Sequence, residues 1–233
     1  MTNTLSNVAY EYLRERLLDG RLHPGTRLVN RTLAKEIGIS FTPVREAIGR
    51  LASEGVVVQV PGAGAFVREL SRDEIISLFG FRTAIECYAA TQAAKKIDDH
   101  QIERLDAICR DWDQLLAQRK SNPAIIEDSA YQANWRSNDV LFHGVVYESA
   151  QNAWMAKIVR DLRMMSSLMI VDADKLKIED AQNTIEHHKA LTDALRRRDE
   201  TAAESLMKAQ MQAGLKVALD SVAKRSPSNS TGW

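Results

Sequence analysis

The segment IGISFTPVREAIGRL, residues 37–51, decides how the first part of the chain folds. Gly38 is suited to end one helix, Thr42 to cap the next, and Pro43 to occupy that helix's first turn. Apolar residues then recur at helical spacing, at Val44, Ile48, Leu51 and Ala52. Two short helices joined by a tight turn at this point are typical of a helix-turn-helix.

The flanking sequence extends this motif on both sides. An apolar helical pattern predicts an earlier helix over residues 5–18, ended by Gly20. Leu33, Ala34 and Ile37 form the face of the short second helix. Residues 56–60 and 65–67 are expected to be strands joined by a Pro-Gly-Ala-Gly turn at 61–64. Residues 1–69 therefore predict a winged helix-turn-helix with a small β-hairpin wing.

The rest of the chain has a different pattern. Seven of the 11 glycines lie in the first 64 residues, and long helical patterns follow a linker at 70–72. We expect an all-α antiparallel bundle over 73–224 and a disordered tail at 225–233. Six helices are expected in this bundle. The first starts at 71 or 73 and runs to 96, with a break near Gly80. The other five cover 101–119, 127–149, 153–170, 178–198 and 201–223. The fold class is mostly α.

Composition limits the possible functions. The 31 basic and 31 acidic residues give zero net charge, so any nucleic-acid contact must come from a local basic surface. The two cysteines, Cys87 and Cys109, have neither disulfide-framework nor metal-site spacing, and they fit a reducing compartment. Apolar runs are too short to cross a bilayer, and no secretory apolar region precedes the first helix. We expect a cytoplasmic protein without membrane contact.

A local basic surface coincides with the helix-turn-helix. Residues 21–50 hold six basic and two acidic side chains. Arg45 near the start of the third helix is placed to reach bases or phosphates, and Arg31 opens the second helix. Ser40 and Thr42 are hydroxyl donors at a helix N-terminus, a favourable phosphate site. The alternatives are a surface pair between Arg45 and Glu46 and a purely capping Thr42.

Residues 6–69 resemble the GntR family of bacterial transcription regulators. The resemblance is carried by residues 20–28 (GRLHPGTRL), Leu33-Ala34, 37–40 (IGIS), 42–47 (TPVREA), Arg50-Leu51, Glu54-Gly55 and 64–67 (GAFV). It implies a homodimer on double-stranded operator DNA. The contacts it implies are Arg31, Ser40, Thr42, Pro43, Arg45 and the wing around Gly62. Phe41 stands where the family usually has Arg, so it either contacts a thymine methyl group or packs on its own domain.

Polar residues interrupt the apolar faces of the later helices. Asp139 and His143 are four residues apart, so they share a helix face and could ligate a divalent metal. His188 and Gln210 lie on the apolar stripes of two further helices. Because an unpaired buried polar group costs about 1–3 kcal/mol, the simplest arrangement is one shared polar pocket. The alternative for each histidine is a hydrogen-bonded core residue.

Residues 73–220 resemble the FCD ligand-binding domain of the FadR subfamily within that family. The matching marks are Asp139, Phe142-His143, Asn152, Glu186-His187-His188, Leu191, Ala194-Leu195, Asp199, Ala203 and Met207. The resemblance implies a divalent metal of the zinc, nickel or manganese class, held by Asp139, His143 and His188. Gln210 replaces the usual third His, so it either leaves a three-ligand site or binds an effector directly in a metal-free pocket. Arg82 either pairs with Glu86 or binds a carboxylate effector.

These observations predict a transcription regulator, most simply a repressor, controlled by an organic-acid effector, and not an enzyme. One rival is a helical metalloenzyme built on the same Asp and His residues, but no general base at a defined spacing accompanies them. The other rival is a ligand-independent architectural DNA binder, which polar residues on buried stripes argue against.

Overall fold

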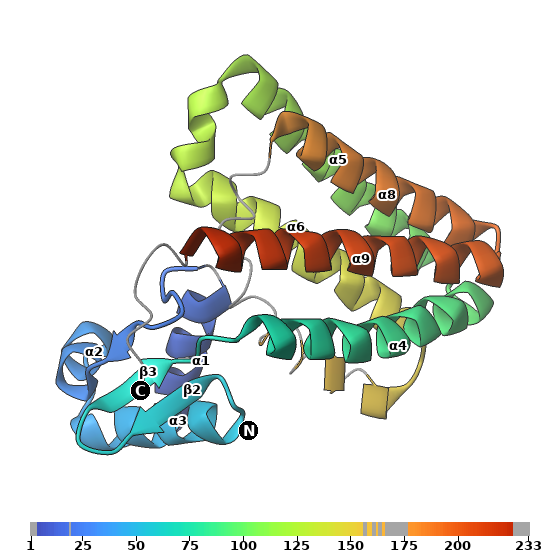
Figure 1. Ribbon diagram of the computed structural model, residues 1–233. Coiled ribbons are helices and arrows are strands. Elements are labelled where there is room, and N and C mark those ends of the chain that lie inside the picture. The colour runs from blue at the N-terminus through green and yellow to red at the C-terminus, as the bar shows by residue number, and fades with distance from the viewer. Residues whose placement is uncertain are drawn as a thin grey trace. The chain divides into compact units, whose positions relative to one another are not determined.

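The computed structural model describes residues 4–18, 20–155, 158, 159, 162, 165 and 177–225. They form two compact units, and the chain passes from the first to the second between Ser71 and Arg72. Residues 162 and 165 group with the first unit. The predicted fold class is confirmed: a small winged helix-turn-helix precedes an all-helical unit (Figure 1).

Three helices make the body of the first unit: α1 (Leu5–Leu18), α2 (Asn30–Ile37) and α3 (Phe41–Ser53). Their apolar faces meet in one core that includes Leu13, Val44 and Leu51. Gly38 ends α2 in the left-handed region at φ 77°, which glycine adopts without a Cβ penalty. The expectation that Thr42 caps the next helix is wrong. The N-cap of α3 is Ser40, whose extended backbone begins the helix two residues earlier.

The wing is a three-stranded antiparallel sheet in the order β1-β3-β2. The hairpin of β2 (Val57–Val60) and β3 (Gly64–Val67) pairs Val57 with Val67 and Val60 with Gly64. The sequence did not indicate β1 (Arg27–Leu28), which pairs with β3. Gly62 in the turn has φ 76°, so its backbone conformation favours glycine although space for a side chain is open.

The second unit contains five long helices in the described part of the chain. They are α4 (Arg72–Lys96), α5 (Asp99–Ser121), α6 (Ser129–Ser149), α8 (Ile178–Arg196) and α9 (Glu200–Arg225), with the short 3₁₀ helix η1 (Pro123–Glu127) before α6. The break expected near Gly80 is wrong, since α4 continues through that residue. Most of the helix expected at 153–170, and residues 226–233 of the expected tail, lie outside the described residues.

Capping and burial explain the start of two helices and the core between them. Asp98 and Gln101 form a reciprocal capping box at α5, and Asp128 accepts two backbone N–H groups at the start of α6. Trp112 of α5 and Phe142 of α6 are fully buried in the core of this unit. Helices α4 and α9 pack along each other in opposite directions (Figure 1). Among the described residues, no helix is long and apolar enough to cross a membrane.

Candidate functional site

The N-terminal part of α3 exposes most of the residues expected to contact DNA. Ser40, Phe41, Thr42 and Arg45 are exposed there, whereas Pro43 is buried in the core of the unit. Phe41 retains 43% exposure and lies under the Arg45 guanidinium, 6.0 Å from its ring centre. An exposed aromatic ring beside a cation at a helix start is available to base edges and phosphates.

Two other predicted DNA contacts are also exposed. Arg31 is the second residue of α2, and Gly62 lies at the turn of the wing. The wing strand β3 also borders Arg27, because a Cβ placed on Gly64 would lie 3.4 Å from the Arg27 Nε. The helix-turn-helix and the wing therefore each have an exposed backbone turn and basic side chains that suit contact with a nucleic acid.

A polar contact fixes α3 against α1. The Tyr10 hydroxyl donates to Glu54, with its oxygen 2.9 Å from Oε2, and Arg50 donates to the same carboxylate from Nε at 3.2 Å. The Arg50 guanidinium also lies 3.6 Å from the centre of the Tyr10 ring. Burial, followed by the hydrogen bond to Glu54, raises the pKa of Tyr10 to about 12. This contact sets the position of the helix that presents Phe41 and Arg45.

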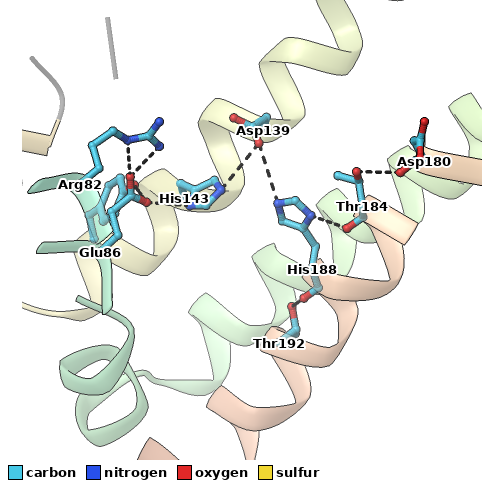
Figure 2. Close-up of polar contacts among 9 residues, drawn as sticks. Arg82, Glu86, Asp139, His143, Asp180, Thr184, His188 and Thr192 are labelled. Carbon is cyan, nitrogen blue, oxygen red and sulfur yellow. Dashed lines mark hydrogen bonds and ion pairs between the residues drawn. The ribbon is translucent and has the colours of Figure 1, made fainter. Parts of the chain in front are cut away.

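In the second unit, Asp139, His143 and His188 come together as predicted from their positions on helical faces. Oδ1 of Asp139 lies 3.7 Å from Nε2 of His143 and 3.9 Å from Nε2 of His188 (Figure 2). The three candidate ligand atoms lie within 4.8 Å of one another. The imidazoles are 4% and 2% exposed, while the Asp139 side chain is 44% exposed. Two buried imidazoles therefore share one partly solvated carboxylate.

The orientation of His188 is fixed by its own helix and by two aromatic rings. Its Nδ1 lies 2.7 Å from the Thr184 carbonyl oxygen. A carbonyl oxygen only accepts, so Nδ1 carries a proton in this contact and Nε2 faces Asp139. Trp112 and Phe142 pack against the imidazole with ring centres 4.4 and 4.5 Å away.

Behind His143 lies a buried charged group. Glu86 is fully buried, and Arg82 donates to its Oε1 from Nε at 2.8 Å and from Nη2 at 2.7 Å. The Tyr147 hydroxyl donates to Oε2 at 2.6 Å, and Nδ1 of His143 lies 3.6 Å from the same oxygen. Of the two alternatives for Arg82, the pair with Glu86 is present.

Gln210 contributes a buried amide. Its Oε1 and Nε2 are both inaccessible to solvent and lack a hydrogen-bond partner among the described residues. Cys87 approaches the Glu204 carbonyl, and a Cβ on Gly214 would lie 3.2 Å from the Phe79 ring. These two contacts define how α4 and α9 are aligned. Because the two helices run in opposite directions, the alignment places Gln210 beside the position of Arg82 along the helix axes.

The three clustered side chains suit a small divalent cation. Tetrahedral ligands at about 2.1 Å from zinc lie about 3.4 Å apart, so this cluster would contract slightly around an ion. The donor set of one carboxylate oxygen and two imidazole nitrogens is one that zinc, nickel and manganese accept. The amide of Gln210 is a weaker ligand than the imidazole that the FCD resemblance leads one to expect.

Sequence reasoning missed three groups that shape this cluster. The carbonyl of Thr184 left no signal, because any residue supplies one. Glu86 was considered only as a partner of Arg82, and no specific role was assigned to Tyr147. Tyr147 and Glu86 are 61 residues apart, and their hydrogen bond depends on how α4 and α6 pack.

Comparison with known proteins agrees with both units. Residues 5–67 match the family model described as bacterial regulatory proteins of the gntR family, and residues 77–213 match the FCD domain model. The chain is 31% identical over 182 residues to the Nta operon transcriptional regulator of Aminobacter aminovorans, covering 77% of this chain and 79% of that protein. It is 28% identical over 196 residues to the gluconate operon transcriptional repressor of Bacillus subtilis, covering 82% and 75% respectively.

A solved structure shares the fold. The structure titled E. coli McbR/YncC superposes with a TM-score of 0.80 at 20% identity, covering 96% of this chain and 99% of that one. The helix-turn-helix, the wing and the helical unit thus occur together in a known regulator architecture. The chain belongs to the GntR family of bacterial transcription regulators and carries an FCD domain.

Proposed function

We propose that this regulator is an operator-binding homodimer, most simply a repressor, whose DNA affinity is set by a small carboxylate bound with a divalent cation in the helical unit. The observation that carries this proposal is the convergence of Asp139 with the two buried imidazoles of His143 and His188, beside the core of the helical unit. A purely architectural bundle has no need for such a group, because burying a polar side chain costs free energy that burying an apolar side chain does not.

The DNA-reading part of the proposal relies on α3 and the wing. Phe41, Thr42 and Arg45 would enter the major groove, while Arg31, Ser40 and the turn at Gly62 would contact backbone phosphates. Pro43 would act indirectly, since it is buried and shapes the start of the helix. The repressor named in Bacillus subtilis supports the sign of regulation.

The charges of the helical unit favour a carboxylate effector. Glu86 balances Arg82, so a divalent ion beside Asp139 would leave one net positive charge in the interior. An anionic oxygen would complete the coordination of that ion, since three protein ligands leave positions open. The remaining guanidinium donors of Arg82 and the amide of Gln210 would bind other oxygens of the effector.

Dimerisation follows from the geometry of operator reading. Helix-turn-helix proteins bind two half-sites one helical turn apart as symmetric dimers. An effector that binds one spacing of the two heads more tightly than another shifts the population towards that spacing. The effector therefore changes operator affinity only through its differential affinity for the two states.

The experiment that tests the proposal compares operator affinity with and without zinc plus a panel of small carboxylates. The wild-type protein is expected to change affinity with at least one member of the panel, and only when the cation is present. His143→Ala should abolish that response and leave affinity of the ligand-free protein for operator nearly unchanged. A variant that responds like the wild type would contradict the role of the cluster.

A further inference from the structure

Glu86 is held more firmly than any other carboxylate near the cluster. Its side chain is 1% exposed, and both oxygens accept hydrogen bonds, Oε1 from Arg82 and Oε2 from Tyr147. A buried carboxylate requires such partners, because desolvation of an unpaired charge strongly destabilises a protein. Its position is therefore fixed from two helices, α4 and α6.

His143 lies between this fixed carboxylate and Asp139. Nδ1 faces Glu86 Oε2 at 3.6 Å, and Nε2 faces Asp139 Oδ1 at 3.7 Å (Figure 2). A neutral imidazole has one proton to give, and the two carboxylates compete for it. Asp139 is half-exposed and also faces His188, whereas Glu86 is fully buried, where electrostatic attraction is stronger.

We infer that Glu86 is a positioning residue that keeps the proton of His143 on Nδ1, so that the Nε2 lone pair points at the cation position beside Asp139. This inference rests on the proposed cation site for its functional meaning. The same tautomer occurs at His188, where the Thr184 carbonyl takes the Nδ1 proton. Two imidazoles from different helices thus present Nε2 to one carboxylate oxygen, and each has an acceptor behind it, at hydrogen-bond distance for His188 and 3.6 Å away for His143.

Glu86→Gln is the informative substitution because Arg82 determines how the new amide would lie. Both Arg82 contacts go to Oε1, so the amide oxygen would remain there and the NH₂ group would take the place of Oε2. An NH₂ group facing Nδ1 donates, which favours the opposite tautomer, with the proton on Nε2. That proton would block the lone pair that the cation needs.

The test measures the His143 tautomer by ¹⁵N NMR on the metal-free protein, at a pH about two units above the ordinary histidine pKa. Zinc affinity is measured in parallel by competition with a chelating dye. We expect an Nδ1–H imidazole in the wild type, an Nε2–H imidazole in Glu86→Gln, and zinc affinity about 10–100-fold weaker in that variant. Glu148→Gln, which alters an exposed pair between α6 and Arg104 of α5, is the matched control.

The possible results separate this inference from the proposed function. In the wild type, an Nε2–H imidazole, or an imidazolium with both nitrogens protonated, overturns the inference. That result needs no variant, so the inference can be tested even if Glu86→Gln does not fold. A folded variant with unchanged tautomer and unchanged zinc affinity also overturns it. A wild type that keeps Nδ1–H but binds no zinc contradicts the cation site and leaves the positioning role of Glu86 supported.

Discussion

His188 donates its Nδ1 proton to the carbonyl oxygen of Thr184, 2.7 Å away and one turn earlier in α8. Together with the packing of Trp112 and Phe142 against the ring, this contact directs Nε2 at Asp139. This local hydrogen bond makes His188 a candidate ligand whose orientation is set in part by helix geometry.

Replacing Asp139 by Asn should remove most of the cation affinity. The substitution keeps shape but loses the only negative charge among the three candidate ligands, so zinc binding should weaken at least about tenfold. Isothermal titration with zinc measures this. Asp113→Asn changes another exposed carboxylate, which pairs with Lys189, and serves as the control. Equal affinities in the two variants would contradict the site.

Gln210→His should strengthen zinc binding. Imidazole is a better ligand than a neutral amide, and the register of α9 against α4 places this residue level with Arg82. We expect at least a tenfold gain in zinc affinity by the same titration. Lys208→His, on an exposed position of the same helix, should give no gain. A Gln210→His protein with wild-type affinity would place the residue away from the cation.

Phe41 should read a thymine methyl group. Its ring is 43% exposed and therefore accessible to a base edge, and burying one methyl contributes about 0.8 kcal/mol, roughly fourfold in affinity. Replacing operator thymines one at a time by deoxyuridine removes only that methyl. One position should weaken the wild type and leave Phe41→Ala unaffected. If no position distinguishes the two proteins, Phe41 does not read a methyl group.

Tyr10 should make stability fall at alkaline pH. Its pKa is raised to about 12 in the folded protein from an ordinary value of 10.0, so the hydrogen bond to Glu54 stabilises the fold fully below pH 10.0. That contribution is lost as pH rises through the folded value. Tyr10→Phe should cost about 1.5 kcal/mol at neutral pH. Urea unfolding at several pH values should show the difference from wild type shrinking above pH 10.0; a constant difference would contradict this account.

The fold could be predicted from sequence wherever a local pattern sets the structure. Gly38 and the apolar spacing of Val44, Ile48 and Leu51 indicated the helix-turn-helix, because turns and helix faces are encoded within a few residues. The two-residue strand β1 was missed, because Arg27 and Leu28 are too few to show alternation. Gly80 was overvalued as a breaker, since neighbouring helix formers and packing carry α4 through it.

From residue spacing, the candidate site was predictable only where contacts lie within one helix, and not where they join two helices. The spacing of Asp139 and His143 fixes a shared helix face, so their proximity follows from sequence. The buried carboxylate of Glu86 could not be connected to His143, because that contact joins α4 to α6 through tertiary packing. The pair between Arg82 and Glu86 could likewise be stated only as one alternative, because the burial of both side chains depends on tertiary packing.

The most direct test of the central claim is the selection of genomic DNA fragments by the purified protein at a fixed salt concentration. We expect wild type and Arg104→Ala, a variant in the helical unit, to enrich the same palindromic fragments, and Arg45→Ala not to enrich them. Neighbouring genes would then indicate carboxylates to test as effectors. Equal enrichment by Arg45→Ala, or no enrichment by the wild type, would contradict operator reading by α3.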